Sequence, residues 1–148
     1  MIRPRAFRFA WRGVLRTFRE EANFRVHLVV AEVILYIAFV ERVDATSLAI
    51  LFLAVGLVLS LECLNTAVER AVDLAAQREQ QPLAAAAKDA AAGAVLAGSI
   101  AAAAVGVAVL WGRLFLLERI FRGPLDYVGL ALLAVLVVLT VRPPLQKE

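Results

Sequence analysis

The sequence predicts an all-α protein that crosses a membrane several times as a polytopic helix bundle. Of its 148 residues, 62% are hydrophobic, and a mean hydropathy of +0.80 is too high for a soluble domain of this size. Uncharged stretches of roughly membrane-spanning length recur along the chain between short polar connectors. A basic, aromatic-rich segment precedes the first of them. We therefore expect an N-terminal interfacial helix, three core spans and a fourth span near the C-terminus.

Residues 1–25 are predicted to form the interfacial helix, because arginines alternate there with bulky apolar side chains. Such a helix lies with its apolar side in the membrane and its guanidinium groups toward the phosphates. The alternative is an anchor that only keeps this end cytoplasmic. The net charge of +3 thus indicates anionic lipid headgroups, and no nucleic acid, as the partner. Glu20 and Glu21 interrupt the basic run, and at least one should face other polar groups.

The first span is predicted from about His27 to Val40, which is short for a ~30 Å hydrocarbon core unless the helix begins near Ala22. Glu32 lies inside this span. A single acid at such a position is expected to hydrogen-bond to a neighbouring helix or to lie next to a substrate. His27 is expected to be an interfacial hydrogen bonder, because the chain has no second histidine to share a metal.

The second span is predicted from Ala45 to about Leu64, and it continues into a polar stripe. A polar connector follows, with Pro82 suited to the first turn of a new helix. The third span, residues 90–111, is rich in alanine and glycine, so we expect it to be central in the bundle.

A last apolar run covers residues 127–141. With a cytoplasmic N-terminus, four spans would place residues 66–89 and the C-terminus in the cytoplasm. The connector at residues 113–122 would then carry three arginines on the outer side. Either the N-terminal charge dominates the topology, or the fourth run is not a true span.

The polar stripe at the end of the second span is the strongest candidate for a functional site. At roughly 100° per residue, Glu62, Asn65, Glu69 and Asp73 project within about 80° of one another on one helix face. The chain is uncharged from Ala45 to Leu61, so Glu62 lies at or just inside the membrane boundary. Acids in such places usually mark a functional site.

Clustered carboxylates without cysteine or a second histidine favour a Mg²⁺ site, and magnesium suggests phosphate chemistry. Glu62 is the deepest acid of the stripe and is our candidate general base, while Glu69 would be a metal ligand. Lys88 offers a point charge for a polyphosphate. Two alternatives remain open: an amphipathic helix whose acids only end the span, and a transporter with an acidic cation site.

The sequence of the stripe closely resembles a motif of small bacterial membrane enzymes, the diacylglycerol kinase and undecaprenol kinase family. The resemblance is carried by the run ECLNTAVERAVD at residues 62–73 and by Ala-Lys-Asp at residues 87–89. Residues 21–27 resemble the family's first motif, in the form typical of undecaprenol kinases. Over roughly residues 5–111, the resemblance implies an ATP- and Mg²⁺-dependent lipid kinase that prefers a polyprenol to diacylglycerol.

Carried over residue by residue, the resemblance implies that Glu62 activates the lipid hydroxyl and that Asn65 supports this base and the lipid headgroup. Glu21 and Glu69 would hold magnesium on the nucleotide, and Asp73 would support the structure. Contacts to the nucleotide are also implied for Phe9, Glu79, Gln81, Lys88 and Asp89.

The chain departs from the family pattern at two places. Gln81 replaces the histidine of Glu-x-His-Pro-Leu, while Glu79 keeps the acid. An amide can still donate a hydrogen bond, so we expect the replacement to bear on nucleotide affinity or selectivity and not on activity itself. The chain also continues beyond residue 117, so we expect a lipid kinase domain at 1–117 and an extension at 118–148. The resemblance further implies a homotrimer with shared active sites at the cytoplasmic face of the cell membrane. The competing interpretation is a non-catalytic membrane protein or a transporter.

Overall fold

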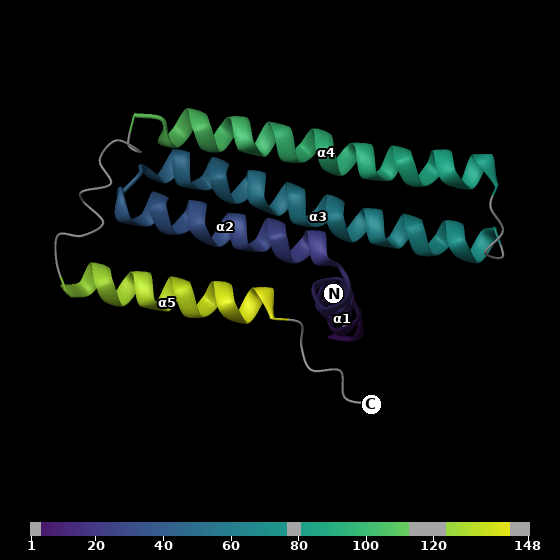
Figure 1. Cartoon of the computed structure of the whole chain (residues 1–148), viewed down its shortest axis with the longest axis horizontal. Helices are drawn as coiled ribbons and strands as arrows, with labels where there is room; N and C mark the ends of the chain where they lie inside the picture. Colours follow the sequence, from purple (N-terminus) through teal and green to yellow (C-terminus); the bar gives the residue numbers. More distant parts are fainter. Residues whose placement is uncertain (1–3, 77–80, 113–123, 143–148) are drawn as a thin grey trace.

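The computed structural model describes residues 4–76, 81–112 and 124–142, and within these ranges the chain is helical apart from short turns. The helices are, in order, α1 (Pro4–Glu20), α2 (Ala22–Val40), α3 (Ala45–Ala75), α4 (Pro82–Leu110) and α5 (Pro124–Val141). Figure 1 shows α2 to α5 lying alongside one another, in the order α4, α3, α2, α5. The all-α prediction is confirmed.

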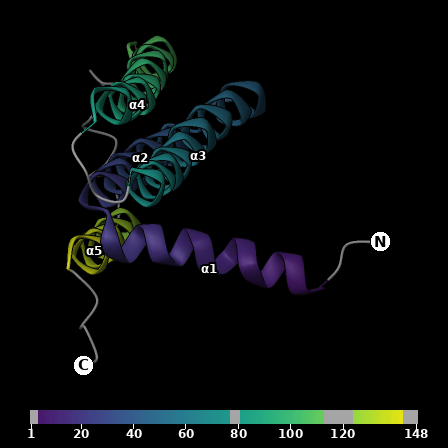
Figure 2. The same ribbon diagram turned by 90° about the vertical axis from the view of Figure 1, so that its right-hand side faces the viewer.

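Helix α1 runs across the direction of the other helices, as Figure 2 shows. The chain turns at Glu21, whose extended backbone (φ −101°, ψ 117°) separates α1 from α2. The Arg25 guanidinium donates to the carbonyl oxygens of Phe18 (3.1 Å) and Arg19 (3.2 Å), which satisfies carbonyls that the end of α1 leaves free. Large apolar side chains of α1, including Trp11, are mostly exposed. This arrangement suits a helix in the membrane interface.

Helices α2 and α3 are joined by a tight turn in which Arg42 adopts a positive φ of 49°. Asp44 caps α3 by accepting hydrogen bonds from the backbone N–H (3.0 Å) and the hydroxyl (2.6 Å) of Ser47, and these bonds lower the pKa of the Asp44 carboxyl. Helix α2 begins at Ala22, so the first span has the longer of its two predicted extents. Helix α3 runs unbroken through the polar stripe for 31 residues, about 46 Å.

Helix α4 begins at Pro82, as predicted, and its main neighbour is α3. The two helices approach closely at Gly98, where a Cβ atom would lie within overlapping distance of the Leu61 side chain. The small residues of α4 therefore permit tight packing. The expected central position is wrong for the single chain, however, because α3 and α2 occupy the middle and α4 an edge (Figure 1).

Helix α5 packs along α2, on the opposite side from α3 and α4 (Figure 1). Gly129 faces Tyr36, and a Cβ atom at that glycine would lie 3.0 Å from the tyrosine hydroxyl. Thr140 donates a 2.8 Å hydrogen bond to Glu32, which confirms the hydrogen-bonded alternative for this intramembrane acid.

Among the described residues, α2, α3 and α4 are long and apolar enough to cross a membrane. The fourth apolar run does form a helix, but its apolar part, Tyr127–Val141, is shorter than those three. A fourth crossing therefore stays a prediction. The arginine-bearing connector at 113–122 lies outside the described residues.

Candidate active site

The polar stripe of α3 meets α1, α2 and α4 at one end of the bundle. Partners of its four residues come from α2, from α4 and from the stripe itself. Sequence spacing alone predicted the shared face, and the structure adds the groups that lie opposite it.

Glu62 is buried, with 3% of its surface exposed. Its Oε1 lies 3.1 Å from Nε2 of His27, which lies in the second turn of α2. One turn along α3, the Thr66 hydroxyl donates to the backbone carbonyl of Glu62 at 3.0 Å. The charges of Glu21 and Glu69 are close enough to act on the Glu62 carboxylate. The predicted base is therefore a desolvated carboxylate beside an imidazole and two further acids.

Asn65 and Glu69 are joined within the stripe, since the Asn65 side-chain N–H donates to Glu69 Oε1 at 2.9 Å. The amide oxygen of Asn65 is buried and accepts no hydrogen bond. Because a buried oxygen without a partner is costly, it marks a place where a cation or a donor would be stabilised. The other carboxylate oxygen of Glu69 takes no part in this hydrogen bond.

Glu21 lies at the break between α1 and α2, next to an ion-pair cluster. Arg70 of α3 places Nη2 2.5 Å from Glu20 Oε2 and 3.7 Å from Glu21 Oε1. Glu20 also accepts a 2.8 Å hydrogen bond from Arg16 one turn earlier. Both acids thus face a polar partner, which confirms the expectation that at least one does. Arg70 fixes the end of α1, and therefore Glu21, against the stripe helix.

Lys88 joins α4 to the far end of the stripe through an ion pair with Asp73 (Nζ to Oδ1, 2.5 Å). The ammonium has three donors, so this contact leaves others available for phosphate. Asp89 is exposed, and its carboxylate makes no hydrogen bond or ion pair with another described residue.

The remaining nucleotide candidates lie at the edge of the described site. Gln81 immediately precedes α4, is exposed, and does not cap the helix with its side chain. Phe9 is 61% exposed on α1, with the Arg8 guanidinium 6.0 Å from its ring centre. Glu79 lies outside the described residues.

The site has the oxygen donors that suit magnesium. Within residues 4–76, 81–112 and 124–142, no group of three or more His, Cys, Asp or Glu side chains has the spacing of a metal cage. Magnesium usually retains water and takes one or two carboxylates together with substrate phosphates, so a protein cage is not needed. Glu69, the unpaired Asn65 oxygen and Glu21 fit this requirement.

Sequence reasoning missed the two inter-helix partners His27 and Arg70. His27 was recognised as a hydrogen bonder, but its partner depends on the register between α2 and α3. Arg70 lies within the stripe motif, directly after Glu69, and pairs with a residue fifty positions earlier. The signal in the sequence that could have indicated this ion pair is an arginine embedded in an acidic stripe.

Comparison with known proteins is consistent with this site. The family described as prokaryotic diacylglycerol kinase matches residues 8–110, which include the stripe and end before α5. A diacylglycerol kinase of Synechocystis sp. is 43% identical over 105 residues, which are 71% of this chain and 60% of that protein. An undecaprenol kinase of Bacillus subtilis is 39% identical over 110 residues, 74% of this chain and 89% of that protein. The match thus spans less than two thirds of the Synechocystis protein, and no solved structure matches the chain significantly.

Proposed function

The chain belongs to the prokaryotic diacylglycerol kinase family, and from this premise we propose that it is a membrane lipid kinase. It transfers the γ-phosphate of ATP to the hydroxyl group of a lipid alcohol. The observation that carries the proposal is the buried Glu62–His27 pair, placed where an apolar span becomes a carboxylate-rich stripe. A lipid hydroxyl and a soluble nucleotide can meet only at such a boundary.

Glu62 is the general base of the proposed reaction. Its carboxylate accepts the proton of the lipid hydroxyl as the alcohol oxygen attacks the γ-phosphorus and ADP leaves. His27 Nε2 holds one carboxylate oxygen, so the other is directed toward the substrate. Burial removes water that would compete for the transferred phosphoryl group.

The polar side of the stripe binds the nucleotide. Glu69 and Glu21 would hold magnesium, with the unpaired Asn65 oxygen as an additional donor. Magnesium bound with ATP would neutralise charge on the phosphates. Lys88, held by Asp73, points a second positive group at the same region, and Asp89, Gln81, Glu79 and Phe9 complete the proposed nucleotide contacts.

Undecaprenol or a similar polyprenol is the proposed substrate, with diacylglycerol second. The two relatives carry these two names, and the match covers 89% of the undecaprenol kinase but 60% of the diacylglycerol kinase. The identities of the lipid substrate, the nucleotide and the metal ion are all part of what we propose.

The enzyme is proposed to act as a homotrimer with its site at the cytoplasmic face of the cell membrane. The arginine-rich α1 supports the orientation through the positive-inside rule. Exposed apolar side chains of α3, such as Phe52 (56%) and Leu53 (74%), need lipid or a neighbouring protomer to cover them. In such an assembly, a neighbour can contribute residues to each site.

The test is phosphorylation of a lipid panel by the purified full chain in mixed micelles with magnesium and γ-labelled ATP. We expect label on polyprenol, and less on diacylglycerol. Transfer to neither lipid, in protein that is folded by circular dichroism, would overturn the proposal and favour a non-catalytic membrane protein or a transporter.

A further inference from the structure

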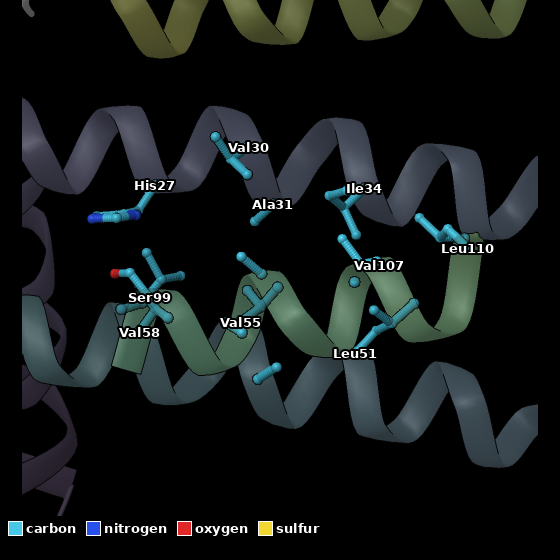
Figure 3. A pocket seen from close by; sticks show the side chains of 15 residues that line it. His27, Val30, Ala31, Ile34, Leu51, Val55, Val58, Ser99, Val107 and Leu110 are labelled. Carbon is cyan, nitrogen blue, oxygen red and sulfur yellow. The ribbon is translucent and has the colours of Figure 1, made fainter. Parts of the chain in front are cut away.

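An apolar cavity of about 310 Å³ lies between α2, α3 and α4. Figure 3 shows it running along the helices from His27 at one end to Leu110 at the other. Its walls are aliphatic, and small residues on α4 and α2, among them Ala31, Ala102 and Gly106, leave the space. Because those side chains are so short, the helices pack closely elsewhere and still leave a partly open cavity here.

The polar lining is confined to one end of this cavity. His27 and Ser99 are its polar lining residues, and they lie at the same end in Figure 3. The Ser99 hydroxyl oxygen is buried and has no hydrogen-bond partner. His27 is the residue that contacts Glu62. The cavity therefore begins beside the proposed base with an unsatisfied hydroxyl and continues as hydrocarbon-like surface.

We propose that this cavity holds the first part of the chain of a single-chain lipid alcohol, and that the Ser99 hydroxyl hydrogen-bonds to the alcohol oxygen. Ser99 thereby becomes a substrate-binding residue that places the hydroxyl beside Glu62. This inference rests on the proposed kinase function and narrows its substrate class.

The volume and the position of the polar end favour one chain over two. At about 310 Å³, the cavity is at the small end of the ~300–1,000 Å³ range of ligand pockets. A polyprenol carries its hydroxyl on the terminal carbon of one chain, so its oxygen and chain can follow one line from Glu62 into the cavity. 1,2-Diacylglycerol carries one chain on the carbon next to its hydroxyl carbon and the other on the following carbon, so its two chains cannot both follow that line. Diacylglycerol should therefore depend less on the cavity than a polyprenol does.

The first test fills the cavity. Ala102→Leu introduces a larger side chain on the cavity wall, while Ala104→Leu makes the same change on the exposed side of α4, away from that wall. We expect Ala102→Leu to lower kcat/KM for polyprenol by about tenfold or more, because a hydrophobic pocket discriminates on this scale per methylene. Activity on diacylglycerol should fall less, and Ala104→Leu should match the unmodified chain with both lipids.

The second test removes the hydroxyl. Ser99→Ala should lower kcat/KM for the lipid while the KM for MgATP stays the same, and Ser99→Thr should restore part of the loss. Unchanged nucleotide binding serves as the folding control for every variant. If Ala102→Leu does not fold, Ala103→Leu takes its place, because Ala103 also lines the cavity.

The outcomes separate this inference from the proposed function. An unmodified chain that phosphorylates no lipid would overturn the kinase proposal itself. An active chain in which Ala102→Leu and Ala104→Leu behave alike would overturn the cavity as the chain site. Equal losses for polyprenol and diacylglycerol would overturn the selection for one chain.

Discussion

Two acids on the apolar helices, Glu62 and Glu32, have different surroundings. Glu62 on α3 faces the ionisable imidazole of His27 and lies near further carboxylates. Glu32 on α2 accepts a hydrogen bond from the neutral hydroxyl of Thr140 on α5, and its other oxygen is buried without a partner. Both carboxyl groups are thus shielded from water and held by another helix.

The difference teaches that burial of an acid in a membrane helix does not by itself identify a reactive group. Glu62 belongs to a stripe of oxygen donors that pairs with Lys88, and its partner His27 lines an apolar cavity, so this is where the proposed nucleotide and lipid would meet. Glu32 has a partner on α5, which lies outside the range matched by the family. We therefore propose proton transfer for Glu62 and helix docking for Glu32.

Glu62→Gln should have the largest effect, because it removes the proposed base and keeps the size of the side chain. We expect kcat to fall by at least about 100-fold, the lower end for loss of a general base. Nucleotide binding, measured by titration with a fluorescent ATP analogue and magnesium, should be retained.

The matched control is Glu32→Gln, the same substitution on α2. Its kcat should stay close to that of the unmodified chain. Equal losses of turnover in the two variants would contradict the assignment of separate roles to the two acids.

His27→Ala should have the second largest effect, since it removes the partner of Glu62 without touching the carboxylate. A hydrogen bond to a charged group contributes about 1.5–3 kcal/mol, so kcat should fall by roughly 10- to 100-fold. The KM for MgATP should change little, because His27 lines the apolar cavity proposed for the lipid. Steady-state kinetics with each substrate varied in turn measure this split.

His27→Gln distinguishes positioning from simple packing. The glutamine amide can still donate a hydrogen bond to Glu62, so part of the lost kcat should return. No recovery relative to His27→Ala would mean that the imidazole contributes more than one hydrogen-bond donor.

Glu69→Gln should act on the nucleotide and not on the chemical step. We expect the KM for MgATP to rise by about tenfold, the lower end of the effect seen when groups around a metal are changed. Raising the magnesium concentration should recover part of this loss, whereas it should not rescue Glu62→Gln. A lowered kcat with an unchanged KM would place Glu69 with the base instead of the nucleotide.

Several features of the fold and of the site follow from patterns that are local in the sequence. The shared face of the stripe needs only the helical repeat, and the start of α4 at Pro82 needs only the preference of proline for a first turn. The orientation of α1 follows from its alternation of arginine and apolar residues.

The contacts between helices depend instead on the register and the relative position of the helices. The contacts of His27 with Glu62 and of Arg70 with Glu20 join residues 35 and 50 positions apart, and a shift of one helix along another would abolish both. The alanine and glycine content of α4 correctly indicated close packing, but it could not say which helix is the neighbour. For the same reason, the partner of Glu32 could not be read from the sequence.

Thr140→Val should have the smallest effect on activity. It is the counterpart of His27→Ala, because both substitutions remove the hydrogen-bond partner of an acid within the apolar helices. The valine keeps the shape of threonine and leaves both oxygens of Glu32 without a donor. Hydrogen bonds between membrane helices contribute about 0.6 kcal/mol on average, so the free energy of unfolding should fall by about that amount, with kcat unchanged. Chemical unfolding in detergent measures the first quantity, and the lipid kinase assay the second.

The double variant Glu32→Leu with Thr140→Val separates loss of the bond from loss of the acid. It removes both polar partners of this hydrogen bond, and replacing both partners by apolar groups can be nearly neutral. Its stability should therefore exceed that of Thr140→Val alone. If kcat instead falls in the double variant and in Glu32→Gln, Glu32 serves the reaction as well, and the contrast with Glu62 is one of degree. Retained kcat in both would mean that Glu32 is not needed for the reaction.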